Sequence, residues 1–331
     1  MPVRVLNFFD LVEADRRRLE SISPGLEVVH LAADRLQSLV DPAAQVILAS
    51  GAPPAEGTPA LKWLQLASAG VDKLAGSDIW RREVTVTNAR GAYAPEMAEY
   101  ILTGLLHASQ RVEERRTLQE RREWPESLIE YECLGLRGRK LLIVGYGTVG
   151  RQTARLAVSF GMRVAAIKAN PHHLADDSFG LPGFGDPEGI LPERVVGIER
   201  LGEEVADADF IAMTIPLTSR TRHLVNAEVL ARMRPSAWLI NVARGAVIDE
   251  EALVDALRER RLAGAWLDVF ETEPLPPESP LWSLPNTTIT PHVSGGNQDS
   301  LGVLTQLCCE NLQRYVAGQP LLNVVRPDLG Y

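Results

Sequence analysis

The sequence predicts an α/β protein with two doubly wound parallel-sheet domains, and three observations lead to that prediction. The chain has 331 residues, and at roughly 150 residues per domain this length corresponds to about two domains. Short apolar runs alternate with helical patterns along most of the chain, which is typical of parallel sheets covered by helices. A glycine-rich motif, Gly145-Tyr-Gly-Thr-Val-Gly150, directly follows one of the apolar runs.

Composition and charge exclude several classes of protein. Hydrophobic residues make up 45% of the chain and charged residues 23%, which is ordinary for a globular protein. The net charge of −9 argues against nucleic acid as the main partner. No apolar run approaches the roughly 18 residues of a membrane-spanning helix, and the N-terminus lacks the pattern of a signal peptide. We therefore expect a cytoplasmic protein with neither a nucleic-acid nor a membrane partner.

The first hundred residues read as alternating strands and helices. A helical pattern covers Leu11–Leu19, and four apolar runs predict strands at Val3–Leu6, Val28–His30, Val46–Ala49 and Val84–Thr87.

One long helix is predicted from Pro95 to Arg122. Its first half is apolar nearly all round and its second half is charged or polar. In one interpretation, such a helix links two domains or lies across a partner subunit. In the other, it is an ordinary core helix with a surface end. The pattern alone leaves both interpretations open.

From residue 140 onward the alternation becomes sharper. Asn226 and Asp249 are placed to cap helices at Ala227–Met233 and Glu250–Arg261, and a last helix is predicted at Asp299–Ala317. The segment Asn170–Gly197 is rich in Pro, Gly, His and Asp, and a loop of that length is often functional. Strands are predicted at Leu141–Val144, Arg163–Ile167, Phe210–Thr214, Ala237–Asn241, Ala265–Val269 and Thr287–Thr290.

The glycine-rich motif predicts a dinucleotide site. Gly145 allows a tight turn, Gly147 lets a pyrophosphate approach the backbone, and Gly150 lets helix and strand pack closely. The helix that follows, Arg151–Phe160, would direct free N–H groups and the positive end of its dipole at the phosphates. The alternative is a tight structural turn, but the strand–turn–helix context favours dinucleotide binding.

The residue after the next strand bears on the choice of cofactor. A dinucleotide fingerprint carries an acid there for the adenosine ribose, whereas this strand ends in Lys168. A cation in that position favours a 2′-phosphate, hence NADP over NAD. The alternative is a solvent-facing lysine with loose cofactor choice.

Three segments at later strand ends carry candidate chemistry. Arg244 precedes a glycine just past an apolar strand, three acids that include Glu273 follow the next, and His292 follows the last. Ligands bind at the carboxyl ends of strands in open α/β sheets. Hydride transfer to a 2-keto acid needs an anion clamp, a proton donor, and a carboxylate that keeps the donor charged. The sequence contains one candidate for each role.

These residues belong to a wider set of matches. The chain resembles the D-isomer-specific 2-hydroxyacid dehydrogenases over nearly its whole length. The matching segments are Ser68-Ala-Gly-Val-Asp72, Met97-Ala-Glu99, Val144-Gly-Tyr-Gly-Thr-Val-Gly150, Pro216-Leu-Thr218, Asn241-Val-Ala-Arg-Gly245, Asp268-Val-Phe-Glu-Thr-Glu-Pro274 and Thr290-Pro-His292.

The resemblance implies a role for each site residue. Arg244 would bind the substrate carboxylate and polarise the carbonyl, His292 would give a proton to the forming alkoxide, and Glu273 would pair with His292. The backbone N–H groups of Ala69 and Gly70 would hold the other side of the carboxylate. The remaining contacts would be with the cofactor, from Thr148 and Val149 at the pyrophosphate, Pro216 at the ring wall and Asp268 at the nicotinamide carboxamide.

The resemblance also implies the domain organisation. Residues 1–97 and 292–331 would form a discontinuous, flavodoxin-like substrate domain, and residues 98–291 a Rossmann nucleotide-binding domain. Members of the family are usually homodimers joined through the nucleotide domain, which suits the long helix after Met97.

A few residues depart from the family pattern or suggest other chemistry. Lys168 replaces the usual acid, and Arg90 stands where the family often has proline, as a second anion contact or, slightly favoured, a solvated side chain. His172 and His173 suggest solvated loop residues, so no metal is expected. Cys308 and Cys309 suggest core packing.

The leading hypothesis is therefore an NAD(P)-dependent reductase of a small 2-keto acid, with glyoxylate or hydroxypyruvate as substrate. One alternative is formate-type oxidation, whose enzymes replace the acid near the histidine by glutamine, so Glu273 speaks against it. The other is a dinucleotide-sensing corepressor-like protein on the same fold, which would keep all three motifs.

Overall fold

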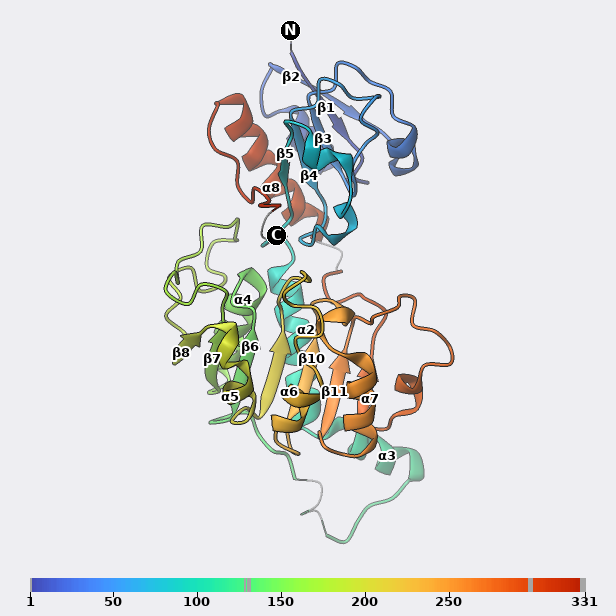
Figure 1. Cartoon of the computed structure of the whole chain (residues 1–331), viewed down its shortest axis with the longest axis vertical. Coiled ribbons are helices and arrows are strands. Elements are labelled where there is room, and N and C mark those ends of the chain that lie inside the picture. Colours follow the sequence, from blue (N-terminus) through green and yellow to red (C-terminus); the bar gives the residue numbers. More distant parts are fainter. Residues whose placement is uncertain (1, 128, 130–131, 297–299, 328–331) are drawn as a thin grey trace. The chain divides into compact units, whose positions relative to one another are not determined.

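The computed structural model describes residues 2–127, 129, 132–296 and 300–327 and divides into two compact units (Figure 1). The first unit runs up to Tyr93 and resumes at Gly296, and the second covers Ala94–Asp176 and Pro182–Gly295. The sequence predicted these boundaries after residues 97 and 291. It did not anticipate that Asp177–Leu181, from the middle of the predicted loop, group with the first unit.

The first unit contains a five-stranded parallel sheet. Its elements are β1 (Val3–Asn7), α1 (Glu13–Glu20), β2 (Leu26–His30), β3 (Val46–Ala49), β4 (Trp63–Leu66), β5 (Thr85–Thr87) and α8 (Ser300–Val316), with short 3-10 helices at Ala33–Ser38, Asp72–Leu74 and Asp78–Arg81. The strand order is β2-β1-β3-β4-β5. Neighbouring side chains along β1 enter different cores, Val5 with Leu304 of α8 and Leu6 with Val86 of β5, as expected for a parallel sheet buried on both faces.

Strand β4 was not predicted. Gln65 lies in its centre and is fully buried, which interrupts the apolar run that marks a buried strand. Its amide is satisfied by long-range partners, since Oε1 accepts from Thr87 Oγ1 at 2.7 Å and from Asn311 Nδ2 at 3.1 Å. Those partners come from β5 and α8, so only the folded chain makes this strand favourable.

The second unit contains a seven-stranded parallel sheet. Its strands are β6 (Lys140–Val144), β7 (Arg163–Ile167), β8 (Arg194–Val196), β9 (Phe210–Met213), β10 (Trp238–Asn241), β11 (Gly264–Leu267) and β12 (Thr287–Ile289). Its helices are α2 (Ala94–Ser109), α3 (Val112–Arg121), α4 (Thr148–Ser159), α5 (Leu201–Val205), α6 (Ala227–Arg232) and α7 (Glu250–Arg258), with 3-10 helices at Ile198–Arg200, Gly245–Val247 and Pro280–Ser283.

The strand order β12-β11-β10-β9-β6-β7-β8 is that of a doubly wound fold. Alternate residues of β6 face separate cores: Leu141 packs with Leu105 of α2 and Ala154 of α4, and Leu142 packs with Leu230 of α6 and Leu253 of α7. Helices therefore cover both faces of this sheet (Figure 1). The order reverses between β6 and β9, and this is where open α/β sheets form their ligand crevice.

The long helix predicted at Pro95–Arg122 is two helices. Arg111 adopts the left-handed conformation with φ 53°, which ends α2 and redirects the chain into α3. No residue of α3 is buried, so no packed face holds the two segments in one straight helix.

The predicted caps at Asn226 and Asp249 are confirmed. Their side chains accept from Val229 N at 3.1 Å and from Ala252 N at 3.1 Å. The loop predicted at Asn170–Gly197 includes β8, a short edge strand that pairs with β7. The start of the predicted last helix, Asp299, lies outside the described residues.

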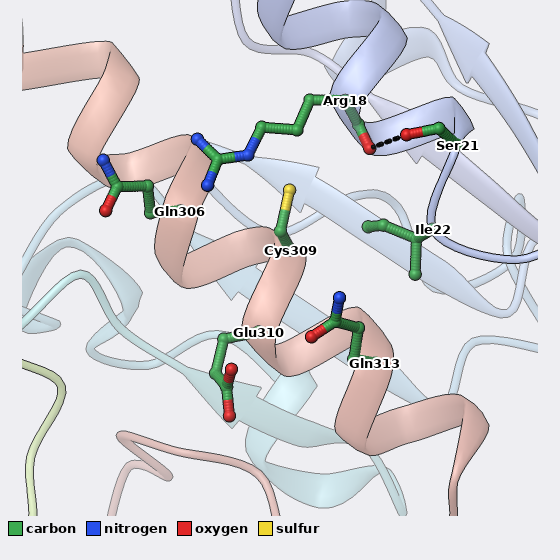
Figure 2. Close-up of a pocket in the computed structure, with 7 residues that line it drawn as sticks. All are labelled: Arg18, Ser21, Ile22, Gln306, Cys309, Glu310 and Gln313. Carbon is green, nitrogen blue, oxygen red and sulfur yellow. Dashed lines mark hydrogen bonds between the residues drawn. The ribbon is translucent and has the colours of Figure 1, made fainter.

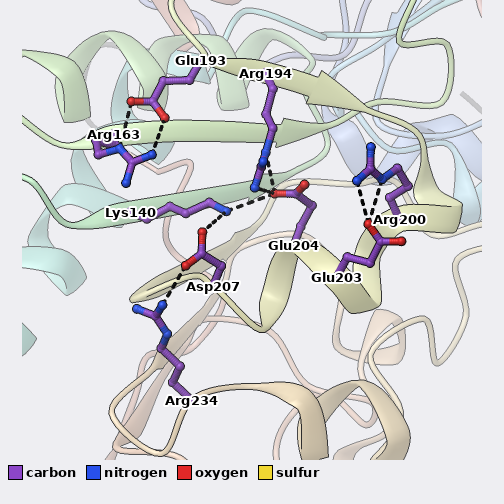
Figure 3. Close-up of polar contacts among 9 residues, drawn as sticks. All are labelled: Lys140, Arg163, Glu193, Arg194, Arg200, Glu203, Glu204, Asp207 and Arg234. Carbon is purple, nitrogen blue, oxygen red and sulfur yellow. Dashed lines mark hydrogen bonds and ion pairs between the residues drawn. The ribbon is translucent and has the colours of Figure 1, made fainter.

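A network of charged side chains surrounds Lys140, the first residue of β6 (Figure 3). Lys140 Nζ is 3.1 Å from Glu204 Oε2 and 3.1 Å from Asp207 Oδ2, and Arg194 is 2.8 Å from the same Glu204 oxygen. The side chains of Lys140 and Glu204 are only 6% and 1% exposed, so the stability of each buried charge depends on its oppositely charged partners.

Among the described residues, no helix is long and apolar enough to cross a membrane.

Candidate active site

The glycine-rich turn connects β6 to α4. Gly145 has φ 111°, and a Cβ there would lie 2.7 Å from the carbonyl of Thr214, so only glycine fits between β6 and β9. A Cβ on Gly150 would meet the carbonyl oxygen of Gly145 at 2.4 Å. At Gly147, by contrast, no atom of the described residues lies within 4 Å of an added Cβ, and none of their side chains caps α4. The turn is therefore closed toward the sheet and open at the start of the helix.

A buried polar network connects the glycine-rich turn and α4 to the long loop between β7 and β8. Tyr146 donates to Asp186 Oδ2 at 2.5 Å, and burial raises the pKa of the phenol, with the hydrogen bond to Asp186 adding to the shift. Arg151 is 1% exposed, stacks 4.8 Å from the centre of the Tyr146 ring and lies 3.2 Å from Asp176. It also donates to the carbonyls of Leu174 and Asp186. No sequence pattern indicates this network, because Tyr146 and Arg151 contact residues that lie 23 to 40 positions further along the chain.

Lys168 lies directly after β7. Its backbone N–H donates to Val196 of β8 at 2.9 Å, which places the residue between two strand ends beside the glycine-rich turn. Pro216 lies three residues after β9, and its carbonyl accepts from Thr221 Oγ1 at 2.7 Å. Both therefore sit at the same edge of the sheet as Gly145.

The structure brings together the ends of the three strands that the sequence singled out. Strands β10, β11 and β12 are parallel neighbours, with Asn241 opposite Leu267 and Leu267 opposite Ile289. Arg244, Asp268 and His292 follow these strands within three residues. They consequently share one edge of the sheet with the glycine-rich turn.

Arg244 stands on a fixed stretch of backbone. Asn241 Nδ2 donates to the Arg244 carbonyl at 3.0 Å, and a Cβ on Gly245 would overlap the carbonyl of Phe270 at 1.8–2.1 Å. Glycine at 245 thus lets the chain after β10 pack directly against the segment after β11. The guanidinium is partly buried and donates to Ala243 O at 2.8 Å.

His292 and Glu273 form a contact pair. His292 Nδ1 is 2.7 Å from Glu273 Oε2, and Glu273 Oε1 accepts from Phe270 N at 3.0 Å. The side chains are 48% and 34% exposed. Because a carboxylate only accepts, Nδ1 carries the proton of this bond, which leaves Nε2 to face a reactant.

Asp268 is fully buried and bound on both oxygens. Oδ1 accepts from Thr290 Oγ1 at 2.6 Å and from Val293 N at 2.8 Å, and Oδ2 accepts from Ser294 N at 2.8 Å. Thr290 in turn contacts the hydroxyl of Tyr100 on α2. Tyr100 and Thr290 were given no role from the sequence, although each lies beside or within a segment that matched the family.

Ala69 and Gly70 belong to the first unit. Their carbonyls are used internally, since Asn88 Nδ2 donates to Ala69 O at 2.8 Å and Ser68 Oγ donates to Gly70 O at 2.7 Å. Among the described residues their N–H groups have no internal acceptor. Arg90, for which a solvated side chain was favoured, is only partly exposed, and its Nε is buried with no hydrogen-bond partner in the described part of the chain.

A separate pocket lies between α1 and α8 of the first unit (Figure 2). Its lining is Arg18, Ser21, Ile22, Gln306, Cys309, Glu310 and Gln313. Burial raises the pKa of the Cys309 thiol to about 11 and that of Cys308 still further. Both thiols therefore stay protonated at neutral pH and pack as apolar groups, and the pocket contains none of the predicted site residues.

Comparison with known proteins identifies the chain. The family model described as "D-isomer specific 2-hydroxyacid dehydrogenase, NAD binding domain" matches residues 102–294. The chain belongs to the D-isomer-specific 2-hydroxyacid dehydrogenase family. It is thus an oxidoreductase of 2-hydroxy and 2-keto acids that uses a nicotinamide dinucleotide, and the match falls on the unit with the glycine-rich turn.

Individual members of the family are similar over most of the chain. A glyoxylate reductase of Korarchaeum cryptofilum is 33% identical over 83% of this chain and 79% of its own length. A D-isomer specific 2-hydroxyacid dehydrogenase of Xanthobacter autotrophicus, solved with NADPH and MES, has a TM-score of 0.83 at 29% identity and covers 100% of both chains. An NADPH-dependent glyoxylate/hydroxypyruvate reductase of Sinorhizobium meliloti, solved with NADP and malonate, has a TM-score of 0.72 at 28% identity and covers 98% of this chain and 97% of its own.

Proposed function

We propose that this dehydrogenase reduces a small 2-keto acid, glyoxylate or hydroxypyruvate, with NADPH. The observation that carries the proposal is the 2.7 Å contact between His292 Nδ1 and Glu273 Oε2, at the same sheet edge as Arg244 and the glycine-rich turn. The relatives from Korarchaeum and Sinorhizobium support the choice of substrate. The structures solved with NADP or NADPH support the choice of cofactor.

The residues around the glycine-rich turn fit a dinucleotide. The open space at Gly147 leaves room for a phosphate close to the backbone, and the uncapped, twelve-residue α4 offers N–H groups and a positive dipole end. The residues that we propose to hold the cofactor are Gly145, Gly147, Thr148, Val149, Gly150, Lys168, Pro216 and Asp268.

Each catalytic side chain then has one task. When bound, the nicotinamide would supply the hydride. Arg244 pairs its planar guanidinium with the substrate carboxylate and polarises the neighbouring carbonyl. His292 donates the proton on Nε2 to the oxygen that gains charge, and Glu273 stabilises the imidazolium before that transfer. Ala69 and Gly70 bind the carboxylate through their backbone N–H groups.

The test is a spectrophotometric panel of glyoxylate, hydroxypyruvate, pyruvate and bulkier keto acids, each with NADH and with NADPH. We expect the two small substrates to give the highest kcat/KM. Tight cofactor binding without turnover of any keto acid would contradict the proposal and favour the sensor alternative. Oxidation of formate would favour the other alternative.

Replacing Lys168 by aspartate tests the cofactor preference. A charged hydrogen bond contributes about 1.5–3 kcal/mol, so kcat/KM for NADPH is expected to fall roughly 10- to 100-fold, with little loss for NADH. The exposed Lys62, directly before β4 of the first unit, provides a matched control, since Lys62→Asp makes the same change of charge outside the unit that contains the turn. If the unaltered protein uses NADH at least as well as NADPH, the role of Lys168 is wrong.

Assembly as a homodimer through the second unit and a cytoplasmic location also belong to this proposal. Light scattering of the purified protein tests the first, with a mass of two chains expected, and cell fractionation tests the second.

A further inference from the structure

We propose that Tyr100 and Thr290 are positioning residues for His292. A hydrogen-bond chain runs from Tyr100 of α2 through Thr290 to Asp268, whose backbone carbonyl accepts from the N–H of His292. The inference rests on the proposed role of His292 as proton donor. It assigns a function to two hydroxyl groups that neither bind substrate nor transfer a proton.

The chain of contacts is continuous. Tyr100 Oη lies 2.5 Å from Thr290 Oγ1, and Thr290 Oγ1 lies 2.6 Å from Asp268 Oδ1. The direction in which each hydroxyl donates its proton follows from Asp268, the last residue of this hydrogen-bond chain. A carboxylate accepts but does not donate, so the single Thr290 proton is directed at Asp268 and Tyr100 must donate to Thr290. Each hydroxyl is therefore used in one orientation.

Asp268 holds the segment that carries His292 on both sides of that residue. On the N-terminal side it binds Thr290, and on the C-terminal side it accepts from Val293 N and Ser294 N, both at 2.8 Å. The backbone carbonyl of Asp268 also accepts from His292 N at 2.9 Å. One residue at the end of β11 thus clamps the turn after β12.

This turn needs a clamp because its backbone conformation is disfavoured. His292 has φ 55°, in the left-handed region that a side chain with a Cβ rarely occupies. Such a conformation persists only where the surroundings determine it. The hydrogen bonds of Asp268 hold the backbone of His292 in this conformation. The contact of Glu273 Oε2 with Nδ1 then sets the direction of the imidazole ring.

Tyr100 is itself held in place from the opposite side. Its ring meets Trp266 of β11 edge-on, with centroids 5.8 Å apart. Gly104, one turn further along α2, lets the helix approach that indole, because a Cβ there would lie 2.9 Å from Trp266. Burial raises the pKa of Tyr100 to about 12, so the hydroxyl keeps its proton across the working range. Helix α2 therefore braces Thr290 through a rigid donor.

Four variants test the proposal. Thr290→Val removes the hydroxyl at constant shape, Thr290→Ser restores it, and Tyr100→Phe removes the first donor but keeps the ring. Thr287→Val is the matched control, because Thr287 is the first residue of β12, the strand that leads into Thr290, and its buried Oγ1 has no hydrogen-bond partner among the described residues. Each is measured for kcat and KM with glyoxylate and NADPH, for NADPH affinity by fluorescence, and for hydrogen exchange in the peptide that covers Val293 and Ser294.

We expect kcat to fall about tenfold in Thr290→Val and about threefold in Tyr100→Phe, since displacing a proton donor affects the chemical step. KM for glyoxylate stays within about twofold, because Arg244 is unchanged. NADPH affinity also stays within about twofold, because the glycine-rich turn is unchanged and Asp268 keeps its hydrogen bonds from Val293 N and Ser294 N. Thr290→Ser and Thr287→Val stay near the unaltered protein. The two amides exchange faster in Thr290→Val than in Thr287→Val.

Equal kcat and equal exchange in Thr290→Val and Thr287→Val would overturn the proposal, as would a loss that Thr290→Ser does not rescue. A rise in KM at constant kcat would also overturn it. The exchange measurement separates this inference from the proposed function, because it reports on the clamp even if the unaltered protein reduces no keto acid.

Discussion

Replacing His292 by asparagine is expected to lower kcat about 10³-fold, within the range of 10²–10⁴ that a positioned general acid contributes. Asparagine can still accept or donate a hydrogen bond near Glu273, but it cannot transfer a proton. The side chain of His292 is 48% exposed, so the substitution removes little packing. Steady-state reduction of glyoxylate, followed by NADPH absorbance, measures the effect.

The control for His292→Asn is cofactor binding. The glycine-rich turn follows a different strand, so NADPH affinity and the thermal midpoint are expected to stay close to those of the unaltered protein. A variant that retained its full reductase rate would show that another group supplies the proton. A variant that lost cofactor binding together with activity would show a structural role instead.

Replacing Lys140 by methionine is expected to destabilise the second unit by about 3 kcal/mol, at the low end of the cost of leaving a buried charge without its partner. Glu204 is 1% exposed, and of its two charged partners among the described residues the variant leaves only Arg194. The ammonium of Lys140 also lowers the pKa of Asp207 through their hydrogen bond. For a unit of this size the thermal midpoint should fall by roughly 6–12 °C.

Figure 3 contains the matched control for Lys140→Met. Arg200 and Glu203 form a contact of 2.7 Å whose side chains are 51% and 64% exposed. An exposed pair of this kind contributes about 0–1 kcal/mol, so Arg200→Met should hardly move the midpoint. Equal shifts in the two variants would mean that burial does not govern the energy of the Lys140 network. Adding Glu204→Leu to Lys140→Met should recover part of the loss, because it removes the charge left behind.

Strong local patterns predicted most of the fold. The predicted strands Val46–Ala49 and Arg163–Ile167 have the predicted bounds. The residues 46–49 and 164–167 are continuous, buried apolar runs, as a strand buried on both faces requires. The caps at Asn226 and Asp249 were also predictable, since a cap acts within three residues.

The errors arose where distant partners decide the local structure. Strand β4 contains a buried Gln65 that is satisfied from β5 and α8, and β8 is an edge strand of three residues. The break at Arg111 depends on α3 having no face to bury. No window of sequence contains those partners.

The candidate site divides in the same way. Arg244, Glu273 and His292 could be named from the chain because each is a chemically distinctive residue at the end of an apolar strand or shortly beyond it. The strand order that makes β10, β11 and β12 neighbours is a property of the assembled sheet. So is the clamp of Asp268, which joins groups 22 to 26 residues away in the chain. Hydrogen bonds act over about 3 Å, and only the folded backbone brings a tyrosine of α2 within that distance of the turn that carries the histidine.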